Sequence, residues 1–280
     1  MHLADGIVTQ TAPVLALNVA GLALTGVAYH RAFRRGSEQA AWTGTLGAFA
    51  LAAQALNVPV WLGTSAHVIG AGLLTLALGP ARAIAALCAV LLVQALLLSD
   101  GGVTVLGINL LTIAILPALS MHACRRAFGQ TLRGLTACAF AGTVIGSLLG
   151  SSTLAFVLVE GGQAPPGLTY GLLVGVQTAA GAVEGALTAV AVRLLHGRAP
   201  GILTLTPAPF AAQSGQRGGW KVFAVAALAV GALVPFASSA PDALERLVGE
   251  ERAEPAARSR AALAEESLGA TEPQTPPDRP

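Results

Sequence analysis

Long apolar stretches separated by short polar segments make up most of this sequence. An apolar helix of about 20 residues crosses a lipid bilayer, with a range of about 17–25. The expected spans are residues 12–30, 40–57, 65–79, 81–98, 104–121, 134–159, 170–195 and 220–238. The third is short, so we expect it to tilt little or to begin inside a polar pocket. The pattern predicts an all-α integral membrane protein: a bundle of about seven transmembrane helices plus one additional C-terminal span.

Composition agrees with a membrane protein. Only 11% of the residues are charged, whereas soluble domains carry about 25%. The charges cluster between the apolar stretches, and the net charge of +2 is too small to indicate a nucleic-acid partner.

Basic residues occur in alternate connecting segments, which predicts the orientation. They are Arg31, Arg34, Arg35, Arg82, Arg125, Arg126, Arg133, Arg193, Arg198, Arg217 and Lys221. The intervening segments, around 1–11, 58–64, 99–103 and 160–169, contain no Lys or Arg. Because basic loops stay in the cytoplasm, we expect a multi-pass protein of the cell (inner) membrane with its N-terminus outside. Residues 1–15 also lack the basic start of a signal peptide, so we expect the mature chain to begin at Met1.

Glycines at four-residue spacing predict close helix packing, because small residues let two backbones approach within a membrane. They are Gly142, Gly146 and Gly150, followed by the pairs Gly171/Gly175 and Gly181/Gly185. The domain boundaries follow from composition. We expect a membrane domain over 1–196, a cytoplasmic linker over 197–219, a further span and its exit over 220–248, and a disordered charged tail over 249–280.

Two histidines fall in segments predicted to lie outside the membrane. The free amine of Met1, the amide nitrogen of His2 and the His2 imidazole can bind one metal through fused chelate rings in one plane. A fourth nitrogen from His67 completes a square. Square-planar nitrogen coordination favours Ni(II) or Cu(II) and accommodates Co(II) with distortion, whereas Zn(II) prefers a tetrahedron.

Polar side chains near the same face are candidates to support the two imidazoles, because metal-bound histidines usually donate their other ring N–H to an acceptor. The candidates are Asp5, Thr64, Ser65, Asp100 and Asn109. Helix capping and turn formation are equally good explanations for each of them. Glu184 stands within an apolar span, where an acid is costly unless it is neutral or paired, and it is a candidate for a structural or coupling role.

The sequence around these residues resembles the CbiM/NikM family, the substrate-binding components of energy-coupling-factor (ECF) transporters for cobalt and nickel. The opening MHLADG is similar to the family's MHxxDG. Residues 57–60 and 63–67 resemble its NVPV…GTSxH element, and 78–80, 94–96 and 100–109 follow in the family's order. The resemblance implies a metal site of Met1, His2 and His67. Gln177 stands where the family often has a histidine, which argues against a His–Glu metal pair with Glu184.

The end of the chain carries a second resemblance. Residues 237–245, ASSAPDALE, are similar to the PDGLE motif of the small CbiN/NikN component, with Ala243 in place of the usual glycine. The second span of that component is absent here. The family implies as partners a transmembrane coupling (T) subunit, cytoplasmic ATPase (A) subunits and a separate small N-type subunit. The chain itself has no GxxxxGK[ST] phosphate-binding loop.

The sequence therefore predicts a metal receptor and not an enzyme, with Ni(II) or Co(II) as its transported substrate and no organic cofactor. An intramembrane enzyme using Glu184 or Asp100 is one alternative, although HExxH, GxSxG and paired-acid motifs are absent. A metal channel that works without ATPase partners is the other. The sequence leaves the choice between nickel and cobalt open; association with cobalamin biosynthesis would indicate cobalt.

Overall fold

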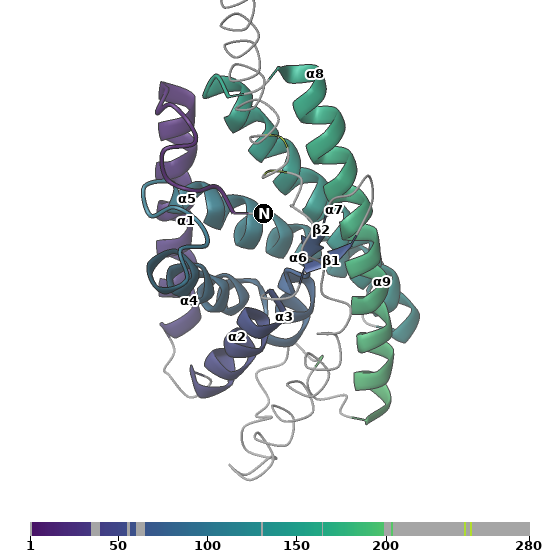
Figure 1. Cartoon of the computed structure of the whole chain (residues 1–280). Helices are drawn as coiled ribbons and strands as arrows, with labels where there is room; N and C mark the ends of the chain where they lie inside the picture. Colours follow the sequence, from purple (N-terminus) through teal and green to yellow (C-terminus); the bar gives the residue numbers. More distant parts are fainter. Residues whose placement is uncertain are drawn as a thin grey trace, which may run out of the picture.

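The computed structural model describes residues 2–34, 40–54, 57–59, 65–129, 131–163 and 165–198, together with Leu203, Leu244 and Leu247. Within these residues the chain forms a helical bundle with one small hairpin, as Figure 1 shows. The predicted span 220–238 and most of the predicted linker and tail lie outside the described residues.

The helices follow the apolar stretches closely. They are α1 (Ala12–Phe33), α2 (Ala40–Gln54), α3 (Ala71–Leu78), α4 (Pro80–Leu97), α5 (Leu106–Asn109), α6 (Leu116–Phe128), α7 (Leu132–Glu160), α8 (Pro166–Thr169) and α9 (Gly175–Arg198), with the π-helical turns η1 (Leu110–Ile115) and η2 (Tyr170–Val174) joining α5 to α6 and α8 to α9. Among the described residues, five helical stretches are long and apolar enough to cross a membrane: 12–33, 80–97, 106–128, 132–160 and 166–197. They correspond to five of the predicted spans.

Two other predicted spans are shorter than expected. The stretch 40–57 is helical only as α2, and residues Asn57–Pro59 form strand β1. The stretch 65–79 begins as strand β2 (Ser65–His67), which pairs antiparallel with β1, and is helical only as the eight residues of α3. At about 1.5 Å per residue, α3 covers roughly 12 Å and cannot cross the hydrocarbon core alone. The all-α prediction thus missed a hairpin, and the count of seven spans is not confirmed.

The glycine spacing in α7 produces close helix contacts. A Cβ atom on Gly142 would lie 2.9 Å from the Met121 Cα, and one on Gly146 would lie 2.7 Å from the Pro117 Cα. The glycine face of α7 therefore packs directly on the backbone of η1 and α6, as predicted.

The glycines of the last helical stretch behave differently from each other. Cβ atoms on Gly181 and Gly185 would meet Ser147 and Phe140 of α7 at 2.5 Å and 3.0 Å, so this pair packs α9 against α7. Among the described residues, Gly171 and Gly175 have no such neighbour within 4 Å, so the packing prediction for them is not confirmed there.

Pro117 explains the wider turn in the middle of the third long stretch. Proline has no N–H and its ring clashes with the carbonyl four residues earlier in a regular α-helix. Here Pro117 begins α6 directly after the π-helical turn η1. The wider turn accommodates the ring without ending the helix.

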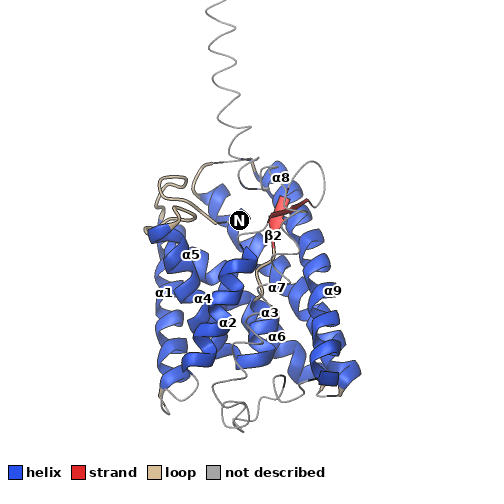
Figure 2. Ribbon diagram, turned by 60° about the horizontal axis from the view of Figure 1, so that its bottom comes forward, coloured by secondary structure: helices blue, strands red, loops and turns tan. Residues whose placement is uncertain are grey.

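The long helices place the two kinds of connecting segment at opposite ends of the bundle. The turn at Gly161 after α7 contacts the segment before α1 through a hydrogen bond from Thr9 N to Gly161 O (3.4 Å). Residues 99–105 join this same end, where β2 and the N-terminal segment also lie (Figure 2). The described basic residues of α1, α6, α7 and α9 lie at the opposite end, for example Arg125 and Arg126 in the last turn of α6. For the parts of these segments that the structure describes, the predicted grouping is therefore confirmed.

Candidate metal site

The histidines of the N-terminal segment and of β2 lie against each other. The rings of His2 and His67 are stacked, with centroids 5.0 Å apart and an interplanar angle of 10°. Asp100, in the segment after α4, holds the first ring, since its Oδ1 lies 3.0 Å from His2 Nδ1. The His2 side chain is 2% exposed, whereas the Asp100 side chain is 49% exposed. Three sequence-predicted residues from three separate segments thus form one cluster.

The distance between the two rings suits a shared metal ion. A metal–nitrogen bond is about 2 Å and the ring centre lies about 1 Å beyond the nitrogen, so two imidazoles at adjacent corners of a square have centroids about 4–5 Å apart. In a chelate of amine, amide and imidazole from residues 1 and 2, the fourth corner is next to the His2 ring. The observed 5.0 Å is close to this value, but the rings are nearly parallel, with an interplanar angle of 10°, so one ring must turn before both can direct an in-plane lone pair at the same ion.

Asn109 fastens the N-terminal segment in the bundle. Its Oδ1 accepts a hydrogen bond from Leu3 N and its Nδ2 donates to Leu3 O, both at 2.9 Å. Gly102 N also donates to Leu3 O at 2.8 Å. Asn109 is 2% exposed and Leu3 is fully buried. Asn109 thus binds the backbone of the residue next to His2.

Asp5 fastens the same segment at a more exposed point. Its carboxylate accepts hydrogen bonds from Val103 N (3.0 Å), from Thr104 N (2.8 Å) and from the Thr104 hydroxyl. These bonds, that of the hydroxyl first, hold the pKa of Asp5 below its ordinary value of 3.8. Like Asn109, Asp5 therefore orients residues 2–5 through backbone groups.

The electrostatics of the site favour a neutral second histidine. Burial lowers the pKa of His67 well below its ordinary value of 6.5, and the nearby His2 adds to the effect. A neutral imidazole has a lone pair for a metal. The hydrogen bond from His2 lowers the pKa of Asp100, so that this carboxylate stays charged beside the ring.

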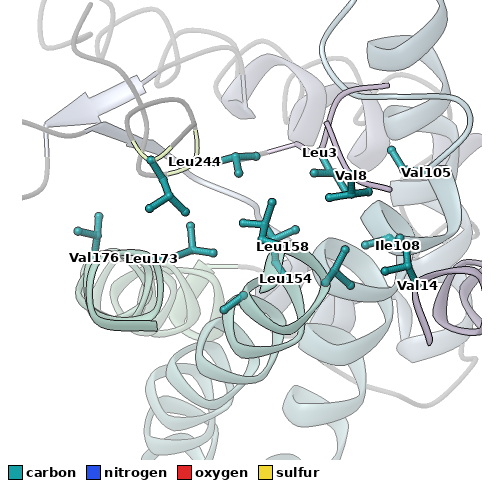
Figure 3. Packing of buried hydrophobic residues seen from close by; sticks show 13 residues of the cluster. Leu3, Val8, Val14, Val105, Ile108, Leu154, Leu158, Leu173, Val176 and Leu244 are labelled. Carbon is teal, nitrogen blue, oxygen red and sulfur yellow. The ribbon is translucent and has the colours of Figure 1, made fainter. Parts of the chain in front are cut away.

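An apolar cluster covers the site from the side of α7 and η2. Figure 3 shows Leu3 and Val8 of the N-terminal segment facing Leu158 of α7. Leu244, from the segment that resembles PDGLE, belongs to the same cluster and is 3% exposed. Residue 244 therefore lies at the same end of the bundle as His2.

Some predicted site residues lie outside the described part of the chain, namely Met1 and Thr64, and of Ser65 only the backbone in β2 is described. Among the described residues no group of three or more His, Cys, Asp or Glu side chains is placed to hold a metal ion.

The Glu184 carboxylate binds backbone N–H groups of a distant segment. Its two carboxylate oxygens accept hydrogen bonds from the backbone N–H groups of Ile69 (3.1 Å) and Gly70 (2.8 Å). These residues follow β2 directly. Glu184 thus binds the segment that carries His67, and its structural or coupling role stays a prediction.

Two buried glutamines near this segment were not predicted. Gln54 Nε2 donates to Ile69 O (2.8 Å), and Gln94 Nε2 donates to Gln54 Oε1 (3.0 Å). Both lie in apolar helices. A buried amide side chain there indicates a hydrogen-bond partner, because a buried amide without one is costly. This indication alone does not identify the partner, since the partner depends on how the helices are rotated against each other.

The comparisons with known proteins point in one direction. A family profile described as "CbiM: Cobalt uptake substrate-specific transmembrane region" matches residues 2–202. A putative metal transport protein of Haloquadratum walsbyi is 32% identical over 68% of this chain and 87% of its own length. A putative fused nickel transport protein NikMN of Archaeoglobus fulgidus is 33% identical over 75% of this chain and 70% of its own length. A cobalt transport protein CbiM of Sorangium cellulosum is 31% identical over 72% and 94%.

A solved structure has the same fold. The crystal structure of a transition metal transporter matches with a TM-score of 0.53 and 24% identity, and it covers 70% of this chain and 93% of that one.

Proposed function

Because this chain belongs to the CbiM family of cobalt uptake substrate-specific transmembrane proteins, we propose that it captures Ni(II) or Co(II) where His2 and His67 meet and delivers the ion for import. The observation that carries the proposal is the pair of stacked imidazoles, 5.0 Å apart, drawn from two distant segments. Both belong to the motifs that the family resemblance covers. The protein acts as a receptor within a transporter and not as an enzyme.

The ligand set that we propose is the amine of Met1, the deprotonated amide nitrogen and Nδ1 of His2, and a ring nitrogen of His67; the amide proton is released to solvent when the metal binds. Only Nδ1 of His2 can close a chelate ring with the amide of the same residue, because Nε2 points away from the backbone. Nδ1 faces Asp100 in the metal-free chain. Metal binding then requires the imidazole to exchange Asp100 for the ion, and a ring turned about Cβ–Cγ can offer Nε2–H to the same carboxylate. Carboxylate–histidine–metal arrangements of this kind are common.

The ligand types set the selectivity. Four nitrogens in a plane suit Ni(II) and accept Co(II), whereas Mg(II) prefers oxygen ligands and waters. Relatives of this chain are named for nickel transport and for cobalt transport. We propose that both ions bind. A competition experiment with Ni(II) and Co(II) measures which ion the site prefers.

Import needs further subunits. We propose that the chain is the substrate-specific component of an ECF transporter, with a transmembrane coupling subunit and cytoplasmic ATPases as partners. The chain has no phosphate-binding loop of the GxxxxGK[ST] form. The segment with Leu244 stands in for part of the small N-type subunit, in agreement with the fused proteins among the relatives. Basic residues at one end and the histidine site at the other support an N-terminus outside the cell membrane.

Metal titration of the purified protein with its native N-terminus tests the proposal. The test compares the wild type with His2→Ala, with His67→Ala and with a chain extended by Gly-Ser ahead of Met1. His30→Ala is the matched control, because His30 is an exposed histidine in the last turn of α1, at the opposite end of the bundle.

We expect stoichiometric Ni(II) or Co(II) in the wild type and the control, and at least a tenfold weaker affinity in the three site variants. An extended chain that binds as tightly as the wild type would refute the amine ligand. Uptake into cells with and without the ATPase subunits separates this proposal from a metal channel, which needs no ATPase.

A further inference from the structure

Glu184 lies in the middle of α9, 115 residues along the chain from Ile69, and is 7% exposed. A charged side chain in an apolar span is costly without partners. Here the partners are two backbone N–H groups of the segment between β2 and α3. The carboxylate is thus aimed at the chain only two and three residues after His67.

Those N–H groups stand at the start of a helix. Gly70 is the N-cap of α3, has a left-handed backbone with φ of 77°, and provides no side-chain cap. The first N–H groups of a helix have no partner within it, and a capping side chain usually satisfies one of them. Glu184 accepts, from another helix, the N–H of the N-cap residue Gly70 and that of Ile69 just before it. It therefore determines where α3 begins and where the preceding segment lies.

Ile69 is held on its other side as well. Its carbonyl accepts the hydrogen bond from Gln54, which in turn accepts one from Gln94. Gln94 O accepts the backbone N–H of Asp100 at 3.0 Å. The network therefore runs from Glu184 past the His67 segment to the residue that holds His2.

The His67 segment has apolar contacts on one side, through Ile69, and two small cavities on another. A cavity of about 30 Å³, lined by His67, Ile69, Ser147 and Gln177 among others, lies beside it. A second, of about 10 Å³, is lined by Ile69, Ser147 and Glu184 among others. The first is about the size of one water molecule. The hydrogen bonds of Glu184 and Gln54 hold this segment on the side where the cavities lie, in addition to the packing of Ile69 against the apolar clusters.

We propose that Glu184 is a positioning residue for the metal site, which holds the His67 imidazole at the fourth ligand position through the backbone of Ile69 and Gly70. This inference rests on the proposed function. It predicts that substitution of Glu184 weakens metal binding through His67 alone and leaves the ligands of residues 1 and 2 in place.

The test measures Ni(II) affinity and the visible absorption of bound Ni(II) in Glu184→Ala, Glu184→Gln, His67→Ala and the double variant Glu184→Ala/His67→Ala. Thr188→Val is the matched control, because Thr188 is buried one turn further along α9 and its hydroxyl donates to the carbonyl of Glu184 within the same helix. Thermal unfolding of each metal-free protein is recorded alongside.

We expect Glu184→Ala to lower the affinity by about 10- to 100-fold, the usual effect of losing a supporting residue of a metal ligand. Its absorption should shift as in His67→Ala, and the double variant should bind no more weakly than His67→Ala. Glu184→Gln keeps one oxygen acceptor and should lose less. The Thr188→Val control should match the wild type.

Two results would overturn the inference. One is a wild-type affinity and spectrum in both Glu184 variants. The other is an additive loss in the double variant, since independent effects add; it would mean that Glu184 acts on the fold in general. If Glu184→Ala does not fold, Glu184→Gln decides by the same criteria. A wild-type protein that binds neither Ni(II) nor Co(II) refutes the proposed function instead.

Discussion

Replacing Asn109 by alanine should release the N-terminal segment from the bundle. The side chain makes two hydrogen bonds of 2.9 Å to the backbone of Leu3, next to His2. The carbonyl of Leu3 keeps its bond from Gly102, but its N–H loses its partner in a buried place. Each lost bond costs about 1 kcal/mol net, and an unsatisfied buried N–H costs about 1–3 kcal/mol. The segment should therefore dock less favourably by about 2–4 kcal/mol.

The effect on metal affinity follows from the docked fraction. A change of about 2–4 kcal/mol shifts an equilibrium by a factor of about 30 to 1,000, since about 1.4 kcal/mol corresponds to tenfold. Apparent affinity falls in proportion to the fraction of chains that are competent to bind. Isothermal titration with Ni(II) should therefore show at least tenfold weaker binding in Asn109→Ala.

The matched control is Ser120→Ala. Ser120 is buried in the same helical stretch, and its hydroxyl bonds to the carbonyl of Leu116 within its own helix. The control should bind like the wild type. If Asn109→Ala binds Ni(II) within twofold of the wild type, then the clamp on Leu3 does not hold the site together.

Three further outcomes follow from the same geometry. The hydrogen bonds of Asp5 contribute stability above its ordinary pKa of 3.8 and lose it as the pH falls through the lowered pKa of the folded chain; protection of the Thr104 amide from hydrogen exchange should drop there, and Asp5→Asn should abolish this pH dependence. Asp100→Ala should change the metal-free environment of His2, seen as a shifted imidazole resonance in NMR, and lower Ni(II) affinity by about tenfold. In Gly107→Ala the added Cβ would clash with the backbone of α1. We expect this overpacking to lower the free energy of unfolding by about 1–3 kcal/mol, and thermal unfolding should show a lower midpoint.

The sequence predicted the parts of the fold that depend on hydropathy alone. The stretches that became α1, α4 and α7 are apolar over the full thickness of a membrane, and no other structure satisfies their backbone there. The stretch 65–79 was not predictable in this way, because its apolar character is compatible with a strand as well as with a helix. What makes its first residues leave the helix is the pairing of β2 with β1 and the left-handed turn at Gly70.

The site was predictable to the extent that it depends on which segments share one end of the bundle. His2, His67 and Asp100 were brought together by that reasoning, and the structure places them in one cluster. The partners of Asn109 and Glu184 are backbone groups of distant segments, and these depend on the rotation of each helix about its axis. This rotation cannot be predicted from the spacing of residues along the chain.

The π-helical turn η1 also sets how α5 and α6 are rotated relative to each other within one continuous helical stretch. Upstream of it, the side chain of Asn109 faces Leu3; downstream, Pro117 faces the glycines of α7. One residue of an α-helix corresponds to about 100° of rotation. Removing a single residue from Leu110–Ile115 would tighten the turn and swing one of these faces away from its neighbour by about that angle. The length of this short stretch therefore matters for the proposed metal site as much as the identity of the proposed ligands does.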